Sequence, residues 1–70
     1  MKATVGDLVY YKGDAEEPPC FGVVSSIKNK YMAIVTWPFP DQDGEATSEI
    51  DIQEVYTGQS YSLTVMKRKA

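Results

Sequence analysis

The sequence predicts one all-β domain in which five short strands close into a small barrel. Its 70 residues make a single domain at most. β-Branched and aromatic residues gather in short runs between turn residues, and no window of helical length keeps apolar residues at three- and four-residue spacing. A flat sheet this small would leave its edges open and one face wet, so we expect the sheet to close on itself.

An acidic loop separates the first two predicted strands. Val5-Gly6-Asp7 supplies turn residues that introduce a strand over residues 8–11. Residues 12–20 contain glycine, acidic residues and two adjacent prolines, a composition that favours neither strand pairing nor a helix. A second strand is predicted over residues 21–28.

A hairpin is predicted to join this second strand to a third over residues 31–37. Asn29 lies at the connection, and asparagine tolerates the left-handed conformation that tight turns require. Alternation along the third strand makes both of its faces apolar. We therefore expect this strand to be central or to line an interface.

The last two strands are expected over residues 45–50 and 60–64. Pro38 and Pro40 end the third strand, and Asp43-Gly44 favours the turn into the fourth. Residues 51–56 suit one 3₁₀ turn better than a full helix. Residues 60–64 alternate strictly, which predicts a half-buried strand. The barrel is assigned to residues 1–66 and a basic C-terminal tail to residues 67–70, which nothing in the pattern requires to be ordered.

Three segments carry a resemblance to a known fold. They are Val5-Gly6-Asp7-Leu8-Val9-Tyr10-Tyr11, Gly22-Val23-Val24 and Ala33-Ile34-Val35-Thr36-Trp37. Together they resemble the first three strands of SH3-like barrels of the Tudor and KOW type, over about half of the chain. The resemblance implies a five-stranded SH3-like barrel with a short 3₁₀ turn before the last strand, and it implies little about function.

The chain also resembles short, uncharacterised proteins of tailed bacteriophages that consist of one SH3-like domain. That resemblance implies a virion component or a modulator of a host protein, located in the virion or the host cytoplasm. Residues 60–70 extend past the point where such chains often stop, which leaves the strand count and the role of the C-terminus open.

Composition argues against catalysis and against structural cross-links. The chain has no histidine, one cysteine and no glycine-rich phosphate loop, so the common bases, nucleophile pairs and disulfides are absent. No apolar stretch approaches the roughly 20 residues that span a bilayer, and no basic region followed by an apolar run opens the sequence. We expect no enzyme, no cofactor, no metal and no membrane partner.

Six aromatic residues are candidates for an aromatic cage, which Tudor-type barrels use to hold methylated lysine or arginine by cation–π attraction. They are Tyr10, Tyr11, Tyr31, Trp37, Phe39 and Tyr56. The alternative interpretation, which the pattern favours, is that these rings fill the barrel and cover its ends.

The segment Trp37-Pro38-Phe39-Pro40 is a candidate binding loop. Two prolines hold an aromatic pair in an extended, pre-ordered conformation that suits insertion into a partner. An ordinary strand end with Phe39 folded onto the core fits the sequence equally well. The predicted partner-binding residues are Trp37, Phe39, Tyr31, Tyr11 and Tyr56.

Two charged segments have simpler interpretations. Residues 41–45 resemble part of a calcium loop, but Phe39 and Ile50 occupy two positions that need oxygen ligands, so a solvated hairpin tip is expected. The basic residues gather at one turn and at the C-terminus, and they are the candidates for contact with nucleic acid. These residues are Lys28, Lys30, Lys67, Arg68 and Lys69.

The function that fits these observations is a noncatalytic protein–protein interaction module. It would present an edge strand or the loop over residues 37–39 to a protein partner whose identity the sequence does not contain. The alternative is a weak nucleic-acid-binding barrel that uses its basic end, although the net charge of −3 argues against a general binder of phosphate backbones.

Overall fold

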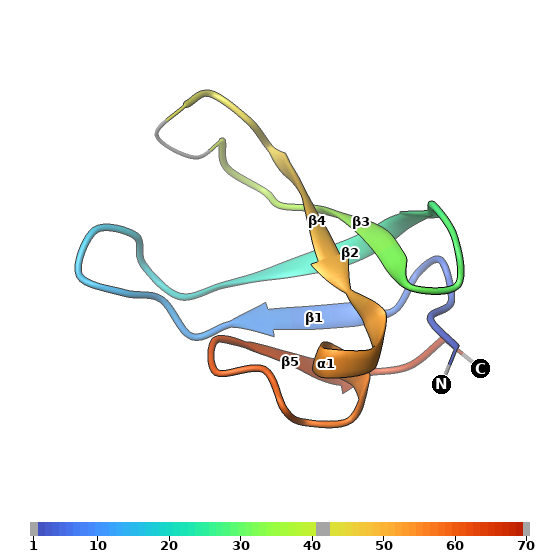
Figure 1. The fold of residues 1–70 in the computed structure, drawn as a ribbon. Coiled ribbons are helices and arrows are strands. Elements are labelled where there is room, and N and C mark those ends of the chain that lie inside the picture. Colours follow the sequence, from blue (N-terminus) through green and yellow to red (C-terminus); the bar gives the residue numbers. More distant parts are fainter. Residues whose placement is uncertain (1, 41–42, 70) are drawn as a thin grey trace.

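The computed structural model describes residues 2–40 and 43–69, and it is built mainly of strands (Figure 1). The strands are β1 (Leu8–Tyr11), β2 (Cys20–Ile27), β3 (Met32–Thr36), β4 (Thr47–Asp51) and β5 (Leu63–Lys67). They form one antiparallel sheet in the order β4-β3-β2-β1-β5, and a short helix, α1 (Ile52–Tyr56), lies between β4 and β5 in the chain. The prediction of an all-β protein is confirmed.

The predicted strands agree with the structure at four places and fail at the fifth. β1 has the predicted bounds, and β2 to β4 differ from the prediction by one or two residues at either end. The last strand was expected over residues 60–64 but occupies Leu63–Lys67. The Ser60 hydroxyl accepts the Leu63 N–H at 3.1 Å in a turn, and pairing of Leu63 with Tyr11 fixes where β5 begins.

The segment before β5 is one turn of α-helix, and the expected 3₁₀ turn was wrong. Asp51 caps the turn, because its side chain accepts the backbone N–H of Glu54 at 3.0 Å. Ile52, Val55 and Tyr56 lie on the buried face, a spacing that suits an α-turn. In residues 2–40 and 43–69, no helix is long and apolar enough to cross a membrane.

The predicted closure of the sheet is not confirmed. β4 and β5 are the two edges of the sheet among the described residues, and α1 packs against β5 rather than leaving the two edges to pair. The chain between β4 and β5 forms this helix and a turn, so it brings β5 back beside β1 (Figure 1). The sheet is strongly bent around a core that consists of Val9, Val24, Ala33, Val35, Ile50, Ile52, Val55 and Tyr56.

A buried carboxylate ties the two ends of the chain to the core. Asp7 is fully buried and accepts the backbone N–H of Thr4 at 2.9 Å, the backbone N–H of Lys69 at 2.6 Å and the hydroxyl of Tyr56. Burial acts to raise the pKa of Asp7, but these hydrogen bonds and the charge of Arg68 outweigh it and lower that pKa. The C-terminal residues, which the pattern did not require to be ordered, are therefore held against the core as far as Lys69.

Candidate functional site

Strand register gathers three loops at one end of the molecule. Tyr11, at the end of β1, lies opposite Cys20 of β2 and Leu63 of β5. Thr36, at the end of β3, lies opposite Thr47 of β4. The loops over residues 12–19, 37–46 and 57–62 therefore start or finish at the same end of the sheet, on the left in Figure 1.

A groove of about 540 Å³ opens between these loops, where β4 and β5 begin. Its volume lies within the range of ligand-binding pockets in proteins. Apolar and aromatic residues make up most of its lining: Tyr11, Pro18, Pro19, Cys20, Trp37, Phe39, Pro40 and Leu63. The segment over residues 37–40, singled out from the sequence, forms one wall of this groove.

Trp37 is the fixed element of the groove. Its indole N–H donates to the hydroxyl of Ser48 at 2.8 Å, and its ring meets the Tyr11 ring edge-on with 6.2 Å between centroids. Gly22 lies beneath it, where a Cβ atom would stand 2.5 Å from Cε3 of Trp37. The orientation of the ring thus depends on a glycine, a hydroxyl and a second ring, each on a different strand or at its end.

Tyr11 and the acidic loop hold each other in place. The Tyr11 hydroxyl donates to Asp14 at 2.5 Å, and the same carboxylate accepts the backbone N–H groups of Glu16 and Glu17 at 2.8 Å. The hydrogen bond to Asp14, with smaller contributions from burial and nearby acids, raises the pKa of Tyr11 to about 12. The hydrogen bonds from Tyr11 and the two N–H groups lower the pKa of Asp14. The loop is therefore pre-ordered beside the groove.

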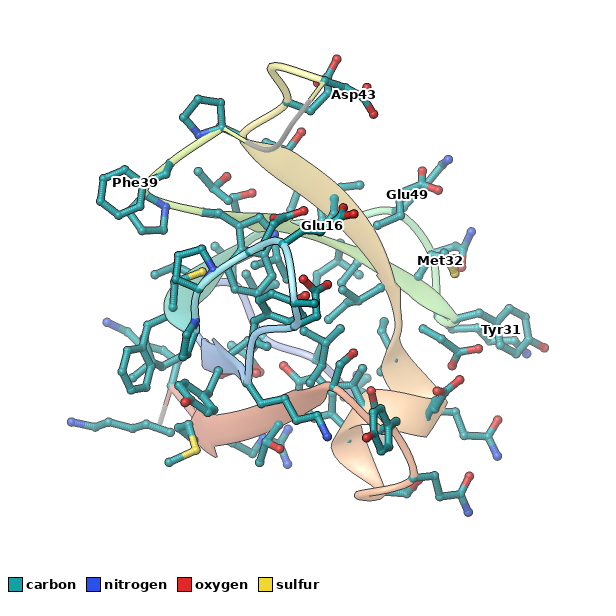
Figure 2. All side chains as sticks on the ribbon, turned by 90° about the vertical axis from the view of Figure 1, so that its left-hand side faces the viewer. Glu16, Tyr31, Met32, Phe39, Asp43 and Glu49 are labelled. Atoms are coloured by element: carbon teal, nitrogen blue, oxygen red, sulfur yellow. The ribbon has the colours of Figure 1, made fainter. Side chains whose placement is uncertain are left out.

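Phe39 projects from the wall of the groove into solvent. It is 70% exposed, and Figure 2 shows its ring pointing away from the body of the molecule. Of the two interpretations open at the sequence level, the ring does not fold back onto the core. Pro38 and Pro40 flank it, so its backbone has little freedom to lose when a partner covers the ring.

Carboxylates line the groove on two of its sides. Glu16 and Glu17 come from the loop before β2, and Glu45 comes from the loop before β4. Among the described residues, the lining contains no lysine or arginine. Burial and then the Glu17 carboxylate raise the pKa of the Cys20 thiol, so this cysteine stays protonated at neutral pH. The groove is an apolar surface with an acidic rim.

The structure brings together only some of the predicted aromatic residues. Trp37, Phe39 and Tyr11 line the groove, as grouped in the prediction. Tyr56 belongs to the core and donates to Asp7, while Tyr31 is 58% exposed at the turn between β2 and β3, at the opposite end of the sheet. The six rings therefore do not form one cage.

The predicted basic residues share the end of the molecule opposite to the groove. Lys28 and Lys30 lie at the turn between β2 and β3, while Lys67 ends β5 and Arg68 and Lys69 follow it toward the C-terminus (Figure 1). Several of them have partners within the chain. Lys28 pairs with Glu49 at 2.5 Å, and Arg68 donates to the Lys2 carbonyl and lies 5.2 Å from the Tyr56 ring.

Sequence reasoning missed several residues of the groove. Cys20 was assigned only to a loop, Leu63 only to a strand, and Glu45 to a strand and a hairpin tip; the structure brings them beside Tyr11 and Trp37. The loop that contains residues 16–19 was predicted to be exposed and acidic. That prediction did not indicate that these residues line a groove together with Trp37. Strand register carries that information, and register depends on contacts far apart in the chain.

Within the part of the chain that the structure describes, no group of three or more histidine, cysteine, aspartate or glutamate side chains is arranged to hold a metal ion. Comparison of the chain with protein-family models, with curated proteins and with solved structures finds no match. The geometry of the groove is thus the observation from which a function is inferred.

Proposed function

We propose that this chain is a noncatalytic protein-interaction domain that binds an extended segment of a partner protein in the groove beside Trp37. The observation that carries the proposal is the association of a fixed aromatic residue, Trp37, with a protruding one, Phe39, in a groove of about 540 Å³. Aromatic residues in pockets are typical anchors of protein interfaces.

The architecture is compatible with an SH3-like barrel. Five strands in one sheet that bends around one core, with a short helical segment before the last strand, support this proposal, although that segment is an α-turn and not the implied 3₁₀ turn. We propose that the fold is an open member of this class, with α1 occupying the gap between the edges. The resemblance to short bacteriophage proteins stays a prediction.

The groove supports protein binding better than the basic end supports nucleic-acid binding. Two of the candidate cations have partners within the chain: Lys28 pairs with Glu49, and Arg68 donates to a backbone carbonyl. Phosphate contacts need cations that exchange solvent ions for phosphate oxygens. By contrast, Phe39 is exposed, and its neighbouring prolines restrict its backbone conformation before a partner binds.

A peptide-display selection followed by binding measurements tests the proposal. Extended peptides selected on the wild-type chain are expected to change the fluorescence of Trp37, the single tryptophan. Phe39→Ala is expected to weaken their binding by about tenfold, since a loss of about 1.4 kcal/mol corresponds to that factor. Because Phe39 is 70% exposed, the variant is expected to fold normally.

Met66→Ala is the matched control, since Met66 is 54% exposed on the outer face of β5 and outside the groove. It is expected to leave peptide affinity unchanged. If the selection returns no peptide, or if Met66→Ala weakens binding as much as Phe39→Ala does, the proposal is wrong. Loss of binding on removal of Lys67, Arg68 and Lys69, with a steep dependence on salt, would instead support the nucleic-acid alternative.

A further inference from the structure

The basic residues of the molecule gather at one of its ends. Six of the seven basic residues lie at the end where the chain begins and finishes: Lys2, Lys28, Lys30, Lys67, Arg68 and Lys69. The seventh, Lys12, lies over the ring of Tyr61 with 3.3 Å between Nζ and the ring centroid. The groove end carries the acidic residues Asp14, Glu16, Glu17 and Glu45. The molecule therefore has an acidic, aromatic groove at one end and a basic surface at the other.

The turn between β2 and β3 is part of the basic end. Its tip carries Tyr31, which is 58% exposed, beside Lys30, whose Nζ lies 5.1 Å from the centroid of the Tyr31 ring. Figure 2 shows Tyr31 and Phe39 on opposite sides of the molecule, each pointing outward. The tip thus presents an aromatic ring and a cation together.

Hydrogen bonds fix the conformation of this turn. The side-chain carbonyl of Asn29 accepts the backbone N–H groups of Tyr31 and Met32 at 2.8 and 3.0 Å. The backbone N–H of Lys28 donates to the Met32 carbonyl at 3.0 Å. A pre-ordered turn loses little conformational entropy when it docks, so its exposed ring is suited to binding.

The acidic residues close to the turn offset part of its charge but leave one side of it cationic. Glu49 pairs with Lys28, and the side chain of Asp51 accepts the Glu54 N–H at the start of α1. Lys30 and Lys2 both line a second, smaller cavity beside the turn, in which no acidic residue takes part among the described residues. A partner approaching this tip meets positive charge and an aromatic ring.

We infer that the groove is occupied by the turn between β2 and β3 of a second copy of this chain, which inserts Tyr31 beside Trp37 and places Lys30 among the carboxylates of the rim. The inference rests on the proposed function, because it names the occupant of the same groove. Charge complementarity selects this occupant: the groove has an acidic rim, and the tip is cationic and aromatic.

The proposed contact between the turn and the groove forms between two molecules and not within one. The turn between β2 and β3 and the residues that line the groove lie at opposite ends of the sheet, so a chain does not fill its own groove. Different surfaces meet in such a contact, which is heterologous and leads to rings or filaments. At physiological salt, charges more than about 8 Å apart are largely screened from one another. The attraction between the acidic rim of one copy and the cationic tip of the next therefore acts at close range and is opposed little by the net charge that both copies carry.

Sedimentation of the wild-type chain at increasing concentration, together with Trp37 fluorescence, tests the inference. Concentration-dependent assembly is expected, and it should weaken by at least about tenfold between about 50 mM and about 500 mM NaCl as screening grows. Assembly is expected to alter the fluorescence of Trp37, because the incoming tip covers that ring. A chain that stays monomeric at millimolar concentration and low salt would overturn the inference.

Two variants separate the two surfaces. Phe39→Lys changes the groove and leaves the tip intact, whereas Tyr31→Glu changes the tip and leaves the groove intact; both positions are exposed. Each variant alone is expected to stay monomeric, and an equimolar mixture is expected to form dimers of one copy of each and nothing larger. Lys30→Glu replaces Tyr31→Glu if the latter does not fold, and Met66→Glu is the control that should assemble like wild type.

Persistence of assembly in either variant alone, or failure of the mixture to pair, would overturn the inference. Its failure is distinguishable from failure of the proposed function. If the wild-type chain stays monomeric while selected peptides still bind in a Phe39-dependent manner, the groove binds proteins and only the second copy is wrong as its occupant. If peptides also fail to bind, both statements are wrong.

Discussion

Removal of the Tyr56 hydroxyl is expected to destabilise the fold substantially. In Tyr56→Phe the ring keeps its place in the core, while the buried Asp7 carboxylate loses one of its three hydrogen-bond donors. Hydrogen bonds to charged groups contribute about 1.5–3 kcal/mol, and Asp7 is fully buried, so water does not replace the hydroxyl. We expect a loss of about 2 kcal/mol in the free energy of unfolding.

This loss is large for a chain of this length. Net stability for 70 residues is of order 4–10 kcal/mol, and each kcal/mol corresponds to about 4–8 °C in melting temperature. Urea unfolding at neutral pH, followed by circular dichroism, measures the change. The control is Tyr61→Phe, because Tyr61 is 85% exposed. A change below about 0.5 kcal/mol in Tyr56→Phe would refute the role assigned to this hydrogen bond.

Acid pH provides a second check on the same group. Although burial alone would raise it, the pKa of Asp7 in the folded chain lies below its ordinary value of 3.8, because of its hydrogen bonds and Arg68. A carboxyl group with a lowered folded pKa stabilises the fold above its unfolded pKa, and that contribution is lost as the pH falls from about 4 toward the folded pKa. In Asp7→Asn this component is absent. The stability difference between wild type and Asp7→Asn is therefore expected to shrink as the pH is lowered below about 4.

Two further substitutions test the groove and its supporting loop. Gly22→Ala would place a methyl group 2.5 Å from Trp37 and 2.6 Å from Val35, so we expect a loss of about 1–3 kcal/mol and a shifted Trp37 fluorescence spectrum; an unchanged melt and spectrum would contradict the packing. Asp14→Asn removes the charged partner of the Tyr11 hydroxyl, so the pKa of Tyr11 is expected to fall from about 12 toward its ordinary value of 10.0. Ultraviolet titration of the tyrosines measures this change, and a titration identical to wild type would contradict it.

Local sequence signals identified the elements whose limits are set by nearby residues. β1 was predicted with its bounds because a glycine and an aspartate precede it. The hairpin around Asn29 was predicted in the right place but for the wrong reason: Asn29 is not left-handed, and its side-chain carbonyl fixes the turn by accepting the N–H groups of Tyr31 and Met32. The last strand was misplaced by three residues. Alternation placed Tyr61, Leu63 and Val65 on one face; Leu63 and Val65 pack against the core, but Tyr61 lies before β5 and is 85% exposed. Alternation alone does not set where a strand begins, and pairing of Leu63 with Tyr11 sets that limit.

Long-range contacts decided the features that the sequence did not reveal. Asp7 was interpreted as a turn residue, yet its partners Tyr56 and Lys69 lie 49 and 62 positions away. The same limit applies to the aromatic residues. Composition does not distinguish Tyr11, which faces the groove, from Tyr56, which fills the core, because the difference depends on which strands become neighbours.

The two ends of the sheet divide stability and binding between them. At one end, Asp7 joins the N-terminal turn, α1 and the C-terminal residues, and this network depends on burial. At the other end, the exposed Phe39 and the acidic loops contribute little buried surface, so exchanging them should cost the fold little. Trp37 is the link, since its ring lines the groove while packing against the core and over Gly22. A fold arranged in this way tolerates changes in the rim of its groove as long as the ring beneath the groove stays fixed, and the binding specificity of the groove is therefore expected to lie in its loops rather than in its strands.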